Sequence, residues 1–159
     1  MESTFDDFTS AVEPQHKVFI KAAHESLLSN GYKMKIEDKA AGLFVSYSHS
    51  KTKRSVLNLF FRKKGLMARL YPDDISGYID LLNDLTESMI KEIDRSAPCK
   101  RLINPGDCNP RCITGYDFII GGKRYQKSRY MCFQFAVTAE NKNILTEWIE
   151  KANDRRNNA

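Results

Sequence analysis

Hydrophobic positions recur every three to four residues between positions 14 and 29, and this spacing predicts an amphipathic helix. Pro14 suits the first helical turn, where its missing N–H leaves no helical hydrogen bond unmade. Asn30-Gly31 follows the last apolar position and predicts the end of the helix. The apolar stripe consists of Val18, Phe19, Ala22, Ala23 and Leu27.

After this helix the pattern changes to alternation of apolar and polar positions, which is typical of half-buried strands. Strands at 32–37 and 43–47 with a turn between them predict a first hairpin. Two apolar runs, 56–61 and 66–71, flank Arg62-Lys63-Lys64-Gly65 and predict a second hairpin.

The middle of the chain predicts two short helices. Pro72 ends the preceding strand, and Asp73 is expected to cap a helix that carries Ile75, Ile79, Leu81 and Leu82. Thr86 is expected to cap a second helix that ends near position 96. The segment 99–112 shows no periodicity and is expected to be a loop.

The last third predicts one more hairpin and one more helix. Strands at 116–120 and 124–137 are expected to turn at Gly121-Gly122. Thr138 is expected to cap a final helix, and the polar tail 153–159 is expected to fray. The apolar positions of this helix are Ile144, Leu145, Trp148 and Ile149.

Strands and helices are segregated along the chain rather than alternating, and this order predicts an α+β fold. We expect an antiparallel sheet built from three β-hairpins, packed against an N-terminal helix, a middle helix pair and a C-terminal helix. A length of 159 residues suits one domain over 1–159. Within it, residues 97–137 could form a subdomain of the cysteine loop and third hairpin.

Composition indicates a globular protein, with 42% hydrophobic and 28% charged residues. No apolar run approaches the ~18 residues of a membrane span, so no membrane partner is expected. The acidic stretch at 1–8 is unlike the basic start of a signal peptide, and no apolar core follows it. We therefore expect a cytoplasmic protein with reduced thiols.

Cysteine is absent from the first 98 residues and occurs at Cys99, Cys108, Cys112 and Cys132. Clustered thiols in a reducing compartment favour metal or redox chemistry over disulfides. Four thiolates are the ligand set of a structural zinc site, so these residues are the candidate metal ligands and zinc the candidate cofactor. The spacing of Cys108 and Cys112 and the mid-strand position of Cys132 are less typical of such sites.

Two other interpretations of the cysteines remain open at this stage. Cys108 and Cys112 could act as a redox dithiol if Arg111, Lys100 and Arg101 lower a thiol pKa. All four could equally be small apolar side chains without a chemical role.

The net charge of +5 permits binding to an anionic partner. Basic residues concentrate at 51–64 and 100–129, and those of the third hairpin interleave with Tyr125 and Tyr130. This pattern suits phosphate contacts and base stacking, so an anionic small molecule or a nucleic acid is the expected ligand class. Alternatively, such charges keep a hairpin soluble and block edge-to-edge pairing. The candidate anion-binding residues are Lys123, Arg124, Lys127 and Arg129.

Sequence motifs of catalysis are missing: no Ser/His/Asp order, HExxH or glycine-rich phosphate loop is present. We therefore expect a non-catalytic binding or regulatory module for an anionic ligand or partner, with a cysteine loop that could hold structural zinc. The alternative is a thiol-dependent redox protein or enzyme that uses Cys108 and Cys112.

Overall fold

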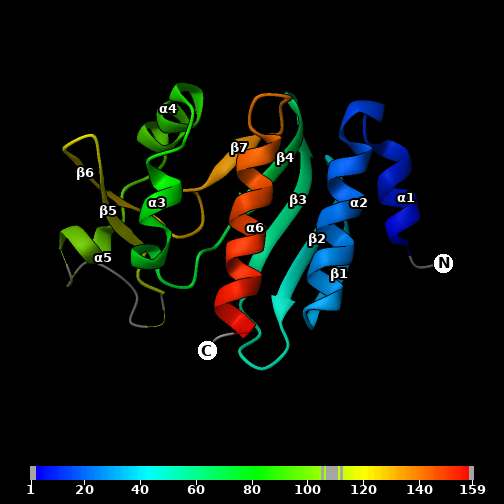
Figure 1. Cartoon of the computed structure of the whole chain (residues 1–159), viewed down its shortest axis with the longest axis horizontal. Coiled ribbons are helices and arrows are strands. Elements are labelled where there is room, and N and C mark those ends of the chain that lie inside the picture. The colour runs from blue at the N-terminus through cyan, green and yellow to red at the C-terminus, as the bar shows by residue number, and fades with distance from the viewer. Residues whose placement is uncertain (1–2, 105, 107–110, 112, 158–159) are drawn as a thin grey trace.

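Helices lie on one face of an antiparallel sheet in the computed structural model of the chain (Figure 1), which describes residues 3–104, 106, 111 and 113–157. The helices are α1 (Phe5–Ala11), α2 (Pro14–Ser29), α3 (Ile79–Leu82), α4 (Glu87–Arg95), α5 (Lys100–Ile103) and α6 (Lys142–Asn157), and a 3₁₀ turn, η1 (Ile75–Tyr78), precedes α3. The strands are β1 (Tyr32–Lys39), β2 (Gly42–His49), β3 (Ser55–Arg62), β4 (Gly65–Leu70), β5 (Tyr116–Ile120), β6 (Lys123–Lys127) and β7 (Gln134–Ala136).

Five of these strands form the main sheet, in the order β1-β2-β3-β4-β7, and β5 and β6 form a separate two-stranded sheet. All pairings are antiparallel. The α+β class is therefore confirmed, with helices at both ends of the chain and an antiparallel sheet between them. None of the helices in the described part of the chain combines the length and apolar character needed to cross a lipid bilayer.

The first two hairpins follow the alternation of the sequence closely. Gly42 and Gly65 begin their returning strands with φ of 129° and 105°, a backbone region that favours glycine. The register places Val45 opposite Leu59 and Tyr47 opposite Leu57, so the apolar side chains of both hairpins share a face.

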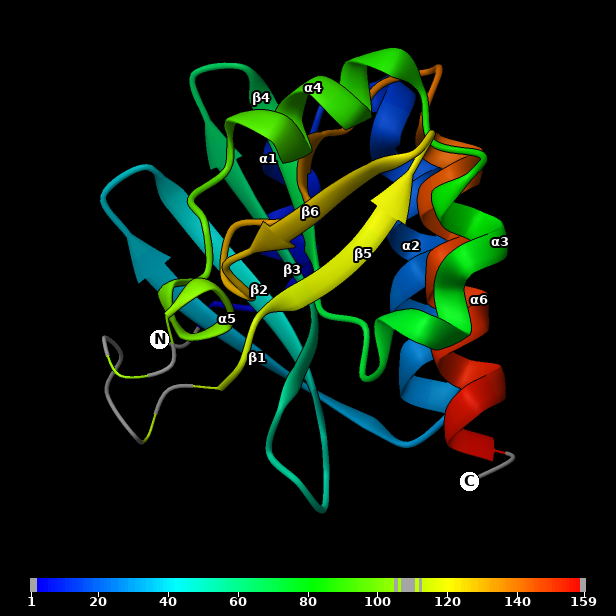
Figure 2. The same ribbon diagram turned by 90° about the vertical axis from the view of Figure 1, so that its left-hand side faces the viewer.

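The third hairpin differs from its prediction. The expected strand 124–137 divides into β6 and β7, because the chain turns where the amides of Met131 and Cys132 both donate to the Ser128 carbonyl. The chain then pairs with the edge of β4, so that β7 joins the main sheet. The hairpin β5–β6 stands beside that sheet, as Figure 2 shows.

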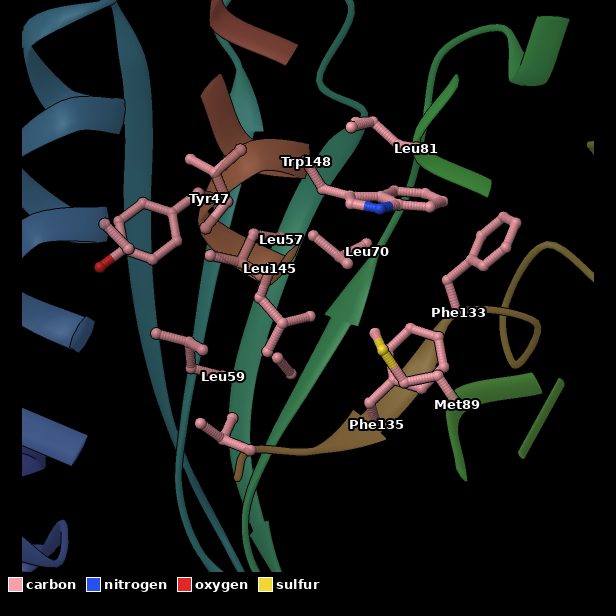
Figure 3. Close-up of a cluster of buried hydrophobic side chains, with 14 of the residues drawn as sticks. Tyr47, Leu57, Leu59, Leu70, Leu81, Met89, Phe133, Phe135, Leu145 and Trp148 are labelled. Atoms are coloured by element: carbon pink, nitrogen blue, oxygen red, sulfur yellow. The ribbon is translucent and has the colours of Figure 1, made fainter. Parts of the chain in front are cut away.

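The core lies between the sheet and the helices α2 and α6 (Figure 3). Trp148 of α6 is its largest fully buried side chain. Its ring centre lies 4.9 Å from that of Phe133 and 5.3 Å from that of Tyr78. Because Phe133 precedes β7 and Tyr78 ends η1, this aromatic cluster joins the middle of the chain to the C-terminal helix.

The C-terminal helix is longer than predicted, and the expectation of a frayed tail is wrong for residues 153–157. Asn153 is buried, and its side-chain amide donates to the Ser26 hydroxyl at 2.7 Å. The Asn157 amide donates to the Asn30 side chain at 2.8 Å. These bonds to α2 and its C-terminus satisfy polar groups that would otherwise favour solvent, so α6 continues through the polar sequence.

Helix caps agree with the sequence in part. Thr86 caps α4 by accepting the Met89 amide, as predicted. Asp74 caps η1 instead of Asp73, by accepting the Ser76 amide. The helix α1 was not predicted, although Thr4 and Asp7 form a capping box that the sequence displays.

Candidate functional site

Two of the four predicted metal ligands, Cys108 and Cys112, lie outside the described residues. Cys99 and Cys132 are both buried free thiols, and the Cys99 sulfur accepts a hydrogen bond from the Gly115 amide at 3.3 Å. Burial raises the pKa of the Cys132 thiol well above its ordinary value. Among the described residues, no three His, Cys, Asp or Glu side chains converge as a metal site would require. The zinc and redox hypotheses therefore stay predictions.

Three of the four predicted anion-binding residues lie on the third hairpin and contact residues of that hairpin or the end of α4. Lys123 forms an ion pair with Asp94 at 2.6 Å, and Lys127 donates to the Asp94 and Ser96 carbonyls at the end of α4. Arg124 makes a two-pronged ion pair with Asp117, at 2.9 and 2.7 Å. These side chains connect the third hairpin to α4 and join its own strands. None of these three residues lines either of the two cavities that Arg129 lines.

The fourth residue, Arg129, occupies a different environment. Its side chain is only 8% exposed, and its Nη1 atom donates to the Pro72 carbonyl at 3.3 Å and to the Tyr116 hydroxyl at 3.0 Å. The guanidinium also lies over the rings of Tyr71 and Tyr116, at 5.6 and 5.5 Å from their centres. No described carboxylate pairs with it.

Arg129 lines a cleft with two connected parts, which we call the arginine cleft. Its inner chamber has a volume of about 250 Å³ and is lined by Tyr32, His49, Thr52, Arg54, Ser55, Val56, Tyr71, Asp73, Tyr78, Arg129, Ala152, Arg155 and Arg156. Its outer basin has a volume of about 510 Å³ and is lined by Arg54, Asp73, Asp74, Ile75, Arg101, Arg111, Ile113, Thr114, Gly115, Tyr116 and Arg129. Three residues, Arg54, Asp73 and Arg129, belong to both parts and mark their junction.

The last turn of α6 supplies two guanidinium groups to the inner chamber. Arg156 lies over the Tyr32 ring at 4.9 Å, and Arg155 lies over the Tyr78 ring at 5.6 Å. Arg155 also donates to both carboxylate oxygens of Asp73, at 2.8 and 3.2 Å. Cations are favoured at a helix C-terminus, so the position of these residues suits the dipole of α6. Figure 1 shows this end of α6 and the β2–β3 turn at the same end of the sheet.

The turn between β2 and β3 supplies Arg54, and His49 organises this turn. The Nδ1 atom of His49 accepts the amides of Lys51 and Thr52, at 3.1 and 3.3 Å. Its proton therefore resides on Nε2. The pKa of His49 is lowered, first by burial and then by the charges of Arg156 and Lys51, so the neutral ring is favoured. The backbone of Lys53 has a φ of 63°, which brings the chain back toward β3.

The cleft is electropositive because its cations outnumber its carboxylates. Asp73 is the one carboxylate among the described residues of the inner chamber, and its partner is Arg155. Arg54, Arg129 and Arg156 form no ion pair with a described carboxylate. Burial raises the pKa values of the Tyr32 and Tyr78 phenols, which keeps both as neutral hydrogen-bond donors. Guanidinium groups and phenols together suit the binding of an anion.

Sequence reasoning found Arg129 and missed Arg54, Arg155 and Arg156. Arg54 lies in the basic segment 51–64 but at a predicted loop, where no direction could be assigned to its side chain. The two α6 arginines lie in the tail that was expected to fray. The spacing from Trp148 to Ala152 and on to Arg155 and Arg156 continues the helical period and could have revealed them.

Comparisons with known proteins do not extend this description. No protein family model, no curated protein and no solved structure matches the chain. The interpretation of the arginine cleft therefore depends on its own geometry and charge.

Proposed function

We propose that this protein is a binding module for an anionic ligand, which it takes up in the arginine cleft. One observation carries this proposal: the Arg129 guanidinium is more than nine-tenths buried and has no described carboxylate partner. Burying a charge without a counter-charge is costly, by several kcal/mol for an isolated ion. An anion in the cleft would offset this cost.

The arrangement of the other arginines supports the same proposal. Arg155 and Arg156 are held over tyrosine rings, and Arg129 is held by two rings and two hydrogen bonds. Guanidinium groups in fixed positions lose little freedom on binding, and this preorganisation favours affinity. The proposal includes a non-catalytic role and the cytoplasmic location expected from the sequence.

Isothermal titration calorimetry with inorganic phosphate and with pyrophosphate tests this function. Arg54→Gln removes an exposed guanidinium at the junction of the two parts, so folding should be little affected. We expect about tenfold weaker binding, because a hydrogen bond to a charged group contributes roughly 1.5–3 kcal/mol.

Lys63→Gln is the matched control, because it removes one exposed positive charge at the β3–β4 turn, which is not part of the cleft lining. Its affinity for both anions should equal that of the unchanged protein. Equal losses in the two variants would mean that net charge alone attracts the anion, and would contradict a site at the arginine cleft. Absence of binding by the unchanged protein would reject the proposed function altogether.

A further inference from the structure

We infer that the anionic ligand of the arginine cleft is a nucleoside 5′-phosphate, with its base in the inner chamber and its phosphate in the outer basin. This inference rests on the proposed function, since it names the ligand class of the same site. The inner chamber, Asp73 at the junction and the outer basin follow one another in the same order as the base, ribose and phosphate of such a molecule.

The inner chamber suits a flat heterocycle. Its walls include the rings of Tyr32, Tyr71 and Tyr78 and the apolar side chains of Val56 and Ala152. A volume of about 250 Å³ falls just below the range of whole small-molecule pockets, so it holds one ring system rather than a complete ligand.

Planar groups and hydrogen-bonding groups in the chamber also match a base. Arg155 and Arg156 line the chamber, and each lies over a tyrosine ring. Bases stack on guanidinium planes as well as on aromatic rings. His49, whose proton resides on Nε2, and Tyr78 also line the chamber, so polar as well as apolar residues border it.

Asp73 stands where the ribose would lie. It lines both parts of the cleft, and its side chain is 63% exposed although it pairs with Arg155. A carboxylate has about four acceptor positions, and Arg155 occupies two of them. The remaining positions can accept the vicinal hydroxyls of a ribose, a pairing that carboxylates make in nucleotide sites.

The outer basin suits the phosphate. Arg54 and Arg129 stand at its junction with the inner chamber, and Arg101 and Arg111 line the basin itself. One guanidinium group can donate two parallel hydrogen bonds to two oxygens of a phosphate, and arginine is therefore frequent in phosphate sites. A plain oxyanion would leave the aromatic chamber empty, whereas a nucleotide fills both parts.

Calorimetric titration with a set of fragments tests the inference. The probes are inorganic phosphate, the four nucleosides, their 5′-monophosphates and the corresponding 2′-deoxy monophosphates. At least one ribonucleotide should bind ten or more times as tightly as inorganic phosphate and as its own nucleoside, since base and phosphate contribute together. The corresponding deoxynucleotide should bind several-fold more weakly.

Asp73→Asn separates ribose recognition from anion attraction. It should remove most of the preference for ribonucleotide over deoxynucleotide, while phosphate itself still binds. The control, Asp80→Asn, breaks a similar exposed ion pair between an aspartate and α6, that of Asp80 with Lys151, which is not part of the cleft lining. It should leave the preference unchanged.

The outcomes distinguish this inference from the proposed function. Binding of inorganic phosphate with no gain from any nucleotide would overturn the nucleotide inference and leave anion binding intact. Tighter binding of a single-stranded oligonucleotide than of any mononucleotide would also overturn it, in favour of a strand-binding groove. Failure of every anion to bind would reject both.

Discussion

At the scale of single residues, three arginines of the cleft lie over tyrosine rings. Arg129, Arg155 and Arg156 each lie over at least one tyrosine ring, and only Arg155 of the three also has a described carboxylate partner. A ring holds a guanidinium without neutralising it, whereas a carboxylate does both. The cleft therefore keeps its positive charge although its side chains are ordered.

The backbone of Gly115 packs closely against the backbone of residues 127–129, and this contact helps to position Arg129. A Cβ atom at this position would lie 2.1 Å from the Lys127 carbonyl oxygen and 3.1 Å from the Arg129 amide nitrogen. The backbone there would have to move, since neither group is a flexible side chain. We expect Gly115→Ala to lower the free energy of unfolding by about 1–3 kcal/mol and to weaken phosphate binding.

Urea unfolding curves of Gly115→Ala and of a control, Gly106→Ala, check this prediction. No described atom lies within 4 Å of the Cβ position at Gly106. The control should unfold at the same urea concentration as the unchanged protein. An unchanged midpoint for Gly115→Ala would contradict the close packing of the Gly115 and Lys127 backbones.

At the scale of elements, the β2–β3 turn, which carries Arg54 of the cleft, is held by a histidine whose protonation depends on pH. His49 holds the turn through its unprotonated Nδ1, which accepts two amides, and protonation would replace this acceptor with a donor. The pKa of His49 is lowered in the folded protein, and the pKa values of His16 and His24 are lowered as well, chiefly by burial.

Stability should consequently decrease on mild acidification. A histidine whose pKa is lowered by folding binds its proton at a higher pH in the unfolded chain than in the folded one. Its contribution is complete above the unfolded pKa of about 6.5 and is lost as the pH falls below that value toward the folded pKa. We expect a lower free energy of unfolding at pH 5.5 than at pH 7.5, measured by urea unfolding at constant ionic strength.

His49→Asn isolates the contribution of the turn. The asparagine oxygen can accept the same amides and does not titrate, so the loss between pH 7.5 and 5.5 should be smaller than in the unchanged protein. An equal loss in both proteins would show that the turn does not take part in the pH dependence.

At the scale of the whole molecule, the cleft is assembled from segments that are distant in the sequence. Its arginines come from the β2–β3 turn, the region of 101–129 and the end of α6. The two basic segments of the sequence thus contribute to one site. Lys123, Arg124 and Lys127, which also suggested anion binding, instead contact partners outside the cleft.

The zinc hypothesis also belongs to this scale, because its four cysteines would tie α5 to the segment before β7. If Cys99, Cys108, Cys112 and Cys132 hold zinc, the purified protein should contain about one equivalent of metal, and a chelator should lower its melting temperature. Metal analysis and thermal melting with and without chelator check this. Metal-free protein with an unchanged melting temperature and four titratable thiols would refute the hypothesis.

Much of the fold could be predicted from the sequence because its signals are local. Residues 14–29 show a helical period and begin with a proline. In the first two hairpins, apolar and polar positions alternate along strands that are joined by turns with glycine. The predicted boundaries of these elements therefore agree closely with the structure. The third hairpin was predicted correctly only up to position 127. The sequence of the predicted strand 124–137 gave no sign that hydrogen bonds to the Ser128 carbonyl would turn the chain toward the edge of β4.

The sequence by itself determined the secondary structure over most of the chain, the α+β class and an excess of positive charge, because propensity, periodicity and composition act between near neighbours. Only the tertiary structure decided which charges remain without a counter-charge. Lys123 pairs with a carboxylate of α4 and Arg124 with one on the neighbouring strand, whereas Arg129 is buried beside tyrosines. Electrostatic pairing depends on distances through space, and those are set only when helices and strands pack.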